Sequence, residues 1–184
     1  MAIINTLYGP LPQNTLKQLA KIKLLVCDVD GVFSDGRIYM GQQGEELKAF
    51  HTRDGYGVKA LLSIGVQLAV ITGRQSNIVE QRMSALGIKH IIQGCEDKQV
   101  AMVSLQKELG LNYKSSAAVG DDMPDLGMFE QSDFCFTVQD AHPSVKQQAH
   151  YITLNKGGFG AVREICDLIL LAKGKLNTIH GANI

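Results

Sequence analysis

Two aspartates separated by one residue follow a short apolar run near the N-terminus. Asp28 and Asp30 come directly after segment 24–27, which we expect to be a buried strand. Ligands of α/β sheets gather at the carboxyl ends of strands, and an acidic pair there attracts a divalent cation such as Mg²⁺. Once charge is neutralised, one carboxylate can attack phosphorus while the other protonates the leaving oxygen. On this segment alone, aspartates that only cap turns explain the pattern equally well.

Three further segments carry groups that suit a phosphate. Thr72 is followed by Gly73 and Arg74, so its hydroxyl and nearby N–H groups can meet phosphate oxygens, or it can simply cap a helix. Lys98 begins a helical pattern and can balance phosphate charge or remain a solvated surface lysine. Segment 120–125, GDDMPD, offers acids that can complete a magnesium site or merely start a helix.

The elements that must position these residues alternate along the chain. Apolar runs predict strands at 24–27, 67–71, 90–93, 117–119, 134–138 and 151–154. Helical spacing of apolar residues predicts helices at 57–64, 76–86, 97–109 and 161–172. Because the strands are almost continuously apolar, they should be buried on both faces. The sequence therefore predicts a doubly wound, Rossmann-like parallel sheet with helices on both faces.

One segment departs from this alternation. Runs 37–40 and 47–51 flank a glycine-containing turn at 41–44, which predicts a β-hairpin over about 37–51 that projects from the sheet. The 184 residues fit a single domain spanning 1–184, with 176–184 expected to be a mobile tail in an isolated subunit.

Composition limits the classes of partner. Eighteen basic side chains balance eighteen acidic ones, which argues against a nucleic-acid or membrane surface as the main partner. No secretory signal or apolar stretch of membrane-spanning length is evident, and the four cysteines form no CxxC pair. These features predict a cytoplasmic protein with free, mostly buried thiols.

The joint order of the chemical segments is more specific than any one of them. DxD, then Thr, Lys and GDDxxD, each near a predicted strand end, resembles the four motifs of the haloacid dehalogenase superfamily over 24–140. The resemblance implies that Asp28 is the nucleophile and Asp30 the general acid/base. It also implies that Thr72 and Lys98 hold the phosphoryl group. By the same resemblance, Mg²⁺ is bound by Asp28, the Asp30 carbonyl and Asp121, with Asp122 and Asp125 as supporting or alternative ligands.

The remaining segments narrow the resemblance. Many superfamily members carry a cap domain, but residues 32–56 leave room for little more than the hairpin, so we expect none. Segments 28–36, 50–57, 141–143 and 157–167 together look like the 3-deoxy-D-manno-octulosonate 8-phosphate phosphatases. That family makes the free sugar acid for lipopolysaccharide. It forms homotetramers in which hairpins build a central barrel and C-terminal tails reach neighbouring active sites.

This narrower resemblance also implies which residues contact the substrate. The implied set comprises Asp30, His51, Thr52, Arg53, Asp54, Gly55, Lys59, Arg74, Arg82 and Lys98. Two positions differ mildly from the family pattern, because some members have threonine at Ser34 and arginine is common at Lys59.

Three other functions compete with this one. A phosphatase for a sialic acid 9-phosphate shares the chemistry and much of the hairpin, although segment 157–167 favours the octulosonate family. A phosphoryl-accepting receiver module also gathers acids, Thr and Lys at strand ends, but it lacks an acid placed like Asp30 and a GDDxxD segment. A catalytically weak scaffold would need none of the four motifs.

Overall fold

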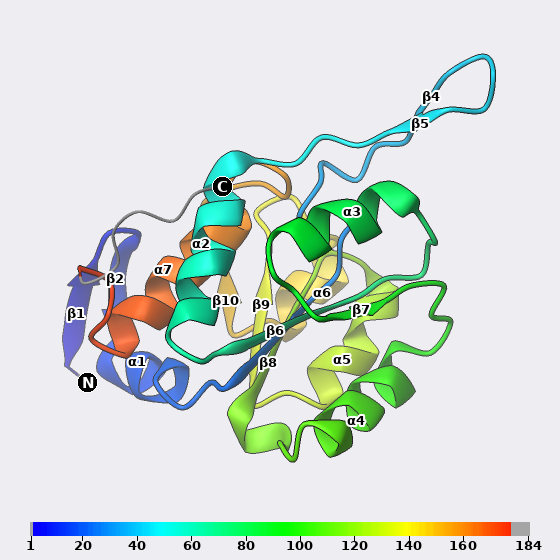
Figure 1. Ribbon diagram of the computed structural model, residues 1–184. Coiled ribbons are helices and arrows are strands. Elements are labelled where there is room, and N and C mark those ends of the chain that lie inside the picture. The colour runs from blue at the N-terminus through cyan, green and yellow to red at the C-terminus, as the bar shows by residue number, and fades with distance from the viewer. Residues whose placement is uncertain (1, 178–184) are drawn as a thin grey trace.

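A central parallel sheet organises the chain. The computed structural model describes residues 2–177 and contains a six-stranded sheet in the order β10-β9-β8-β3-β6-β7, with every neighbouring pair parallel (Figure 1). Its strands are β3 (Leu24–Cys27), β6 (Gln67–Ile71), β7 (His90–Ile92), β8 (Ser116–Gly120), β9 (Phe134–Thr137) and β10 (Tyr151–Ile152). All six predicted strands are confirmed to within two residues at each end.

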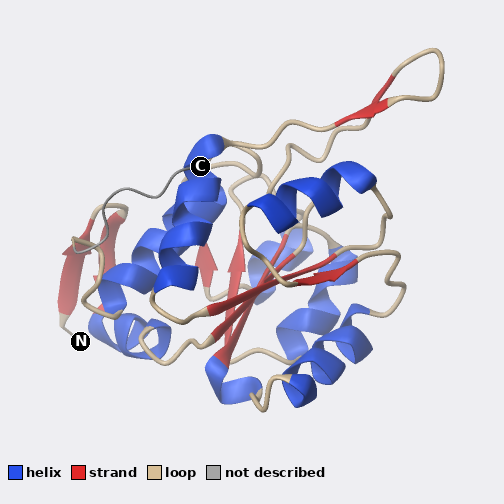
Figure 2. Ribbon diagram, viewed as in Figure 1, coloured by secondary structure: helices blue, strands red, loops and turns tan. Residues whose placement is uncertain are grey.

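Alternate residues of each strand feed two separate cores. Leu25 and Val70 join a cluster with α1 (Gln13–Leu19), α2 (Thr52–Ser63), α3 (Asn77–Ala85) and α7 (Ala161–Ala172). Leu24 and Ile71 point the other way, toward α4 (Lys98–Glu108), α5 (Leu126–Glu130) and α6 (Pro143–Gln148). Because side chains alternate between the faces of a strand, both faces of this sheet are apolar and both are covered by helices (Figure 2). The predicted doubly wound architecture is confirmed.

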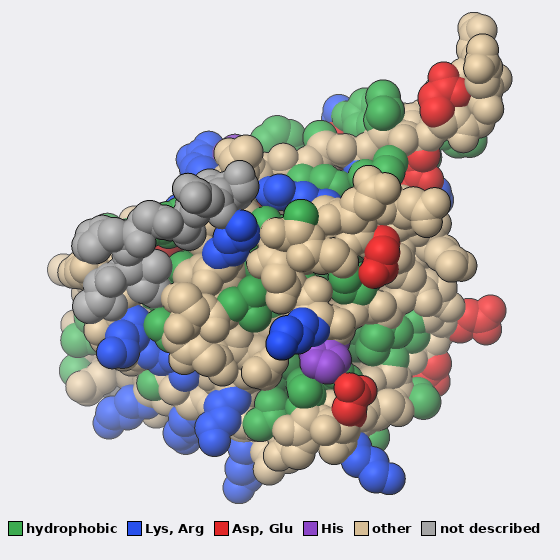
Figure 3. All heavy atoms as spheres, viewed as in Figure 1, with side chains coloured by type: hydrophobic (Ala, Val, Ile, Leu, Met, Phe, Trp, Pro, Cys, Tyr) green, Lys and Arg blue, Asp and Glu red, His purple; other side chains and the backbone are tan. Residues whose placement is uncertain are grey.

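The predicted hairpin is present and stands clear of the body. Its strands, β4 (Tyr39–Met40) and β5 (Glu46–Leu47), pair in antiparallel fashion at the end of two long connections (Figures 1 and 3). The paired part, Tyr39–Met40 with Glu46–Leu47, is shorter than the predicted runs 37–40 and 47–51. Between β3 and α2 the chain forms this hairpin and connecting turns, and no cap domain.

The N-terminal residues form a second hairpin that the sequence did not predict. Strands β1 (Ile3–Thr6) and β2 (Gly9–Pro12) pair beside α1. In their turn, the Tyr8 hydroxyl donates a hydrogen bond of 2.7 Å to Asp167 of α7, so this arm packs on its own domain. At the other end, Leu176 packs against the larger core, and residues 178–184 of the predicted tail lie outside the described residues.

Helix α2 begins earlier than predicted, and its first turn carries residues 52–55 of the expected substrate loop. α2 begins at Thr52, five residues before the predicted start at 57, because the His51 ring accepts a hydrogen bond from the Arg53 N–H at 3.1 Å and caps the helix. Two short 3-10 helices, η1 (Tyr113–Ser115) and η2 (Met123–Asp125), flank β8. None of the described helices combines the length and apolar character needed to span a bilayer.

Candidate active site

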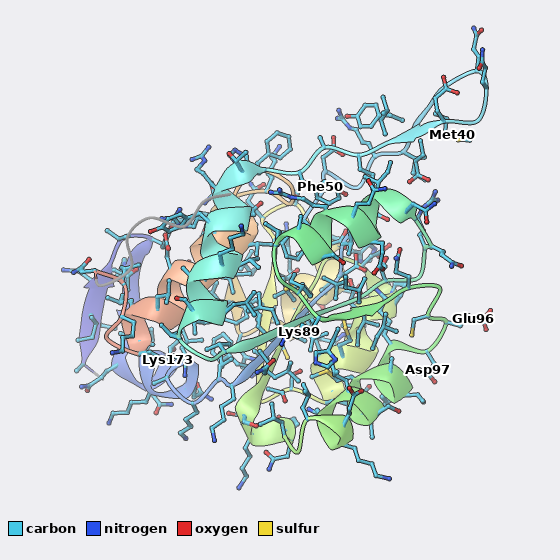
Figure 4. All side chains as sticks on the ribbon, viewed as in Figure 1. Met40, Phe50, Lys89, Glu96, Asp97 and Lys173 are labelled. Atoms are coloured by element: carbon cyan, nitrogen blue, oxygen red, sulfur yellow. The ribbon has the colours of Figure 1, made fainter. Side chains whose placement is uncertain are left out.

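Three strand ends and one helix start meet at a single cavity. β3, β6 and β8 are adjacent in the sheet, so Asp28, Thr72 and Asp121, each following one of them, converge. The cavity has a volume of about 530 Å³. Its lining consists of Asp28, Asp30, Gly36, Thr72, Gly73, Arg74, Cys95, Glu96, Lys98, Asp121, Asp122, Pro124 and Asp125. Of these residues, Glu96 is labelled in Figure 4, in the loop that leads into α4.

A buried ammonium lies between two carboxylates at the floor of this cavity. Lys98 Nζ is 2.5 Å from Asp28 Oδ1 and 2.7 Å from Asp125 Oδ1, and all three side chains are less than one-tenth exposed. Burial alone would lower the pKa of Lys98, but the two neighbouring carboxylates outweigh it and raise that pKa above its usual value. Lys98 therefore stays charged and orients Asp28.

The acids together carry more negative charge than one lysine balances. Burial raises the pKa of Asp28 to about 6, and repulsion from Asp125 adds to this shift. Burial also raises the pKa of Asp121 to about 8, and repulsion from Asp28 is the next largest cause. One carboxylate oxygen from each of Asp28, Asp121 and Asp125 lies within 4.8 Å of the others. A buried cluster of oxygen donors with raised pKa values fits a hard divalent cation, of which Mg²⁺ is the usual choice.

Glycines make this close assembly possible. A Cβ on Gly31, whose φ is +96°, would lie 2.1 Å from Asp121 Oδ2. Behind the same turn, a Cβ on Gly157 would lie 1.7 Å from the carbonyl oxygen of Gly31, and the Gly158 N–H donates to Val32 O at 2.9 Å. The loop that carries Asp30 is thus held between Asp121 on one side and segment 157–158 on the other.

Backbone hydrogen bonds fix the other positions. The Asp28 N–H donates to Val119 O at 2.9 Å, and the Thr72 N–H donates to Ile92 O at 2.9 Å, which continues the sheet past the strand ends. Asp125 Oδ2 accepts from the N–H groups of Asp121 at 2.8 Å and Asp122 at 3.2 Å. Asp125 therefore shapes the loop that presents Asp121, in addition to its contact with Lys98.

Comparisons with known proteins show the family to which this chain belongs. A family model described as haloacid dehalogenase-like hydrolase matches residues 90–165. The 3-deoxy-D-manno-octulosonate 8-phosphate phosphatase of Yersinia pestis is 49% identical over all of this chain and 98% of its own length. That of Escherichia coli K12 is 46% identical over all of this chain and 97% of its length. This chain belongs to the 3-deoxy-D-manno-octulosonate 8-phosphate phosphatase family.

Solved structures of family members agree with this assignment. The crystal structure of the Yersinia pestis phosphatase superposes with a TM-score of 0.96 over 100% of this chain and 99% of that one, at 49% identity. A structure from Moraxella catarrhalis, in complex with magnesium ion, phosphate ion and a KDO molecule, has a TM-score of 0.87 at 43% identity. It covers 90% of this chain and 96% of its own. Both the fold and the haloacid dehalogenase resemblance are confirmed.

The cavity collects the predicted catalytic and metal-binding residues but only part of the predicted substrate set. Of the residues that the family resemblance implied for the sugar acid, Asp30, Arg74 and Lys98 line it. The others lie elsewhere in this chain: His51, Thr52, Arg53, Asp54, Gly55, Lys59 and Arg82. Segment 51–55 forms the cap and first turn of α2, and Arg53 lines a separate pocket of about 170 Å³ beside Tyr8 and Arg163.

Asp54 in particular faces the interior. Its side chain is 1% exposed, and its Oδ1 accepts a hydrogen bond of 2.7 Å from the Arg163 N–H at the start of α7. Its Oδ2 is buried and accepts no hydrogen bond. Burial raises the pKa of Asp54 to about 6 despite the Arg163 N–H and Arg53. In this chain Asp54 ties α2 to α7.

Two charged residues next to Asp30 were not predicted from the sequence to belong to the site. Lys48 contacts Asp30 Oδ1 directly, and Glu46 lies 3.3 Å from Lys48 Nζ and 3.4 Å from Arg74 Nη2. Both come from the hairpin, where charged residues are ordinarily solvated. Glu46 and Lys48 are two residues apart, which places both side chains on one face of a strand. This spacing is the one feature of the sequence that could have indicated that they act together.

Proposed function

We propose that this chain is a Mg²⁺-dependent phosphatase that hydrolyses 3-deoxy-D-manno-octulosonate 8-phosphate to the sugar acid and inorganic phosphate. The observation that carries this proposal is the buried Asp28 carboxylate, held by Lys98 at 2.5 Å at the floor of a cavity shared with Asp30 and Asp121. The substrate is that named for relatives such as the Yersinia pestis phosphatase, which is 49% identical over the whole chain. Because no cap domain lies between β3 and α2, a neighbouring subunit would have to cover this cavity.

In the first step Asp28 attacks phosphorus. The Asp28 oxygen forms a bond to phosphorus as the bond between phosphorus and the sugar oxygen breaks, and Asp30 gives its proton to the departing alkoxide. In the second step water attacks phosphorus and releases Asp28, while Asp30 takes the proton from that water. Lys98 and the N–H groups after Thr72 offset the charge of the phosphoryl oxygens.

The metal site would use the acids that already crowd the cavity. Asp28, the Asp30 carbonyl and Asp121 would hold Mg²⁺, with Asp125 supporting the loop of Asp121 and Asp122 at its rim. Bound there, Mg²⁺ would neutralise charge on the phosphoryl oxygens and on the Asp28 carboxylate. The raised pKa values of Asp28 and Asp121 support this assignment, because burial and the repulsion between neighbouring acids disfavour their charged forms, and a bound cation would offset both effects.

Substrate recognition is proposed to extend beyond one subunit. Arg74, at the cavity rim, would meet the carboxylate or hydroxyls of the sugar acid. Residues that lie away from the cavity would contribute from a neighbouring subunit: His51, Thr52, Arg53, Lys59 and Arg82. Asp54 and Gly55 are buried, and we assign them to the packing of α2.

We further propose that residues 1–184 form one domain and that four copies assemble through their hairpins. On the hairpin and its approach, Ile38, Tyr39, Met40 and Leu47 are between 43% and 77% exposed. Exposed apolar side chains gathered on a projecting element favour burial against another copy. The cytoplasmic location and the place in lipopolysaccharide synthesis stay predictions.

The test is phosphate release from 3-deoxy-D-manno-octulosonate 8-phosphate with Mg²⁺, beside a sialic acid 9-phosphate. We expect rapid release from the first substrate and far slower release from the second. Asp28→Asn should abolish release, whereas Asp133→Asn, a matched change outside the cavity, should not. Fast release from the nine-carbon substrate would favour the sialic acid alternative. A long-lived phosphorylated Asp28 without turnover would favour a receiver-like module.

A further inference from the structure

The side chain of a lysine next to the hairpin is buried, which is unusual for a projecting element. The Lys48 side chain has no exposed surface, although it lies one residue beyond β5. Lysine is almost never fully buried unless its charge is paired, because removing an ammonium from water is costly. Its partners are the carboxylates of Asp30, in direct contact, and Glu46, with 3.3 Å between Nζ and Oε1. Figure 4 shows the chain returning to the body at Phe50, shortly after this residue.

The Asp30 carboxylate is held from several sides. Ser34 Oγ donates a hydrogen bond of 3.1 Å to the same oxygen, Oδ1, that Lys48 contacts. Arg74 Nε approaches the other oxygen, Oδ2, at 4.0 Å. The Asp30 side chain is itself 20% exposed and lines the cavity, so these neighbours decide where its open face points.

The four charges form a closed ring of alternating sign. Asp30 meets Lys48, Lys48 meets Glu46, Glu46 meets Arg74 at 3.4 Å, and Arg74 returns to Asp30. Asp30 and Arg74 line the cavity, whereas Lys48 and Glu46 do not. Lys48 therefore reaches the reacting atoms only through Asp30. Asp28 has its own contact with Lys98 at 2.5 Å, so Lys48 is the partner of Asp30 and not of the nucleophile.

We propose that Lys48 is a positioning residue that fixes the orientation from which Asp30 protonates the leaving oxygen. This inference rests on the proposed phosphatase function, in which Asp30 is the general acid. Through Lys48 the hairpin is part of the active site of its own subunit. General acid catalysis contributes roughly 10²–10⁴-fold, and it requires the donor within hydrogen-bonding reach of the leaving oxygen.

The inference predicts a loss that depends on the leaving group. Lys48→Met retains most of the length of the side chain and removes its charge. It should lower kcat/KM for benzyl phosphate, whose alkoxide must be protonated, by about 10–100-fold, the loss expected when a catalytic group is misplaced. For p-nitrophenyl phosphate, whose phenolate leaves without a proton, the loss should stay below about 3-fold. Since kcat/KM covers events up to the first irreversible step, later hydrolysis of the aspartyl phosphate does not mask the difference.

A double-mutant cycle with Asp30→Asn completes the experiment. If Lys48 acts through Asp30, adding Lys48→Met to Asp30→Asn changes kcat/KM for benzyl phosphate by less than about 2-fold. Lys89→Met, on the exposed surface labelled in Figure 4, is the control and should match the native chain for both phosphates. Circular dichroism and gel filtration establish that each variant is folded and assembled as the native chain is. Lys48→Gln provides a second charge removal if Lys48→Met does not fold, with the same leaving-group pattern expected.

Several results would overturn the inference. Equal losses for the two phosphates would mean that Lys48 acts by another route, as would losses that multiply in the double variant. Native rates in both Lys48 variants would leave it with no role in positioning. Each of these results leaves the phosphatase proposal intact, because the native chain is active in all of them. A native chain that releases phosphate from neither compound, nor from 3-deoxy-D-manno-octulosonate 8-phosphate, would overturn the phosphatase proposal and this inference together.

Discussion

Replacing Asp54 by asparagine separates a structural role from a substrate-binding one. Asp54 is 1% exposed, and its carboxyl pKa is raised from 3.8 to about 6, chiefly by burial. The folded chain therefore binds this proton more tightly than the unfolded chain does. Stability from Asp54 is full below about pH 4 and is lost as the pH rises through about 6.

The size of the effect follows from the two pKa values. One pKa unit corresponds to about 1.4 kcal/mol, so ionised Asp54 lowers the free energy of unfolding by about 3 kcal/mol at neutral pH. Between about pH 7.5 and about pH 4.5, the native chain should gain about 2 kcal/mol relative to Asp54→Asn. Any fixed difference between the aspartate and asparagine hydrogen bonds cancels, because only the change with pH is compared.

Urea unfolding at several pH values measures this change. Protein concentration is held constant, since assembly of subunits contributes to apparent stability. Glu130→Gln, which neutralises an exposed acid, should give a curve parallel to that of the native chain. A constant difference between Asp54→Asn and the native chain from about pH 4.5 to 7.5 would refute the burial argument. If Asp54→Asn left stability unchanged but raised KM strongly, Asp54 would instead have a role in substrate binding.

Three further results are expected. In the absence of metal at about pH 8, Lys98→Met should lower the free energy of unfolding by roughly 3–5 kcal/mol, because Asp28 and Asp125 lose a buried partner. Calorimetry with and without Mg²⁺ measures this loss, and full native stability would contradict it. Gly31→Ala should reduce Mg²⁺ affinity by at least about tenfold, since a Cβ would lie 2.1 Å from Asp121 Oδ2; titration calorimetry tests it, with Gly110→Ala, which meets no atoms within 4 Å, as the control for a left-handed glycine. Mg²⁺ affinity should fall by at least about tenfold from about pH 8 to about pH 6. Asp121 has a pKa of about 8 and Asp28 a pKa of about 6, and both must lose their protons to bind the metal. An affinity independent of pH would show that these acids are already ionised in the metal-free chain.

The parts of the fold that follow from local patterns were predictable. Buried parallel strands are apolar on both faces, so β3, β6 and β8 appear as continuous apolar runs, and the chemical groups follow directly at their ends. α7 begins and ends as predicted, because its apolar residues repeat regularly and Gly174 follows it. The order of the strand ends along the sheet then brings Asp28, Thr72 and Asp121 together.

The parts that depend on partners distant in sequence were not. β2 was missed because Pro10 and Pro12 are typical of turns, yet an edge strand tolerates them. The early start of α2 depends on His51 as its cap, and histidine is not a typical capping residue. Lys48 has the sequence context of a solvated hairpin lysine, and only the fold brings it to Asp30, 18 residues earlier.

The contact between Gly157 and the Gly31 carbonyl joins two segments that are synthesised far apart in time. Residues 28–31 leave the ribosome long before residues 157–158, which close against them with the hydrogen bond from Gly158 to Val32. A nascent chain that ends before Gly157 therefore contains every acid of the cavity but lacks the backbone surface that fixes their loop. The chemical centre, encoded mostly in the first two-thirds of the chain, is completed only by the last third.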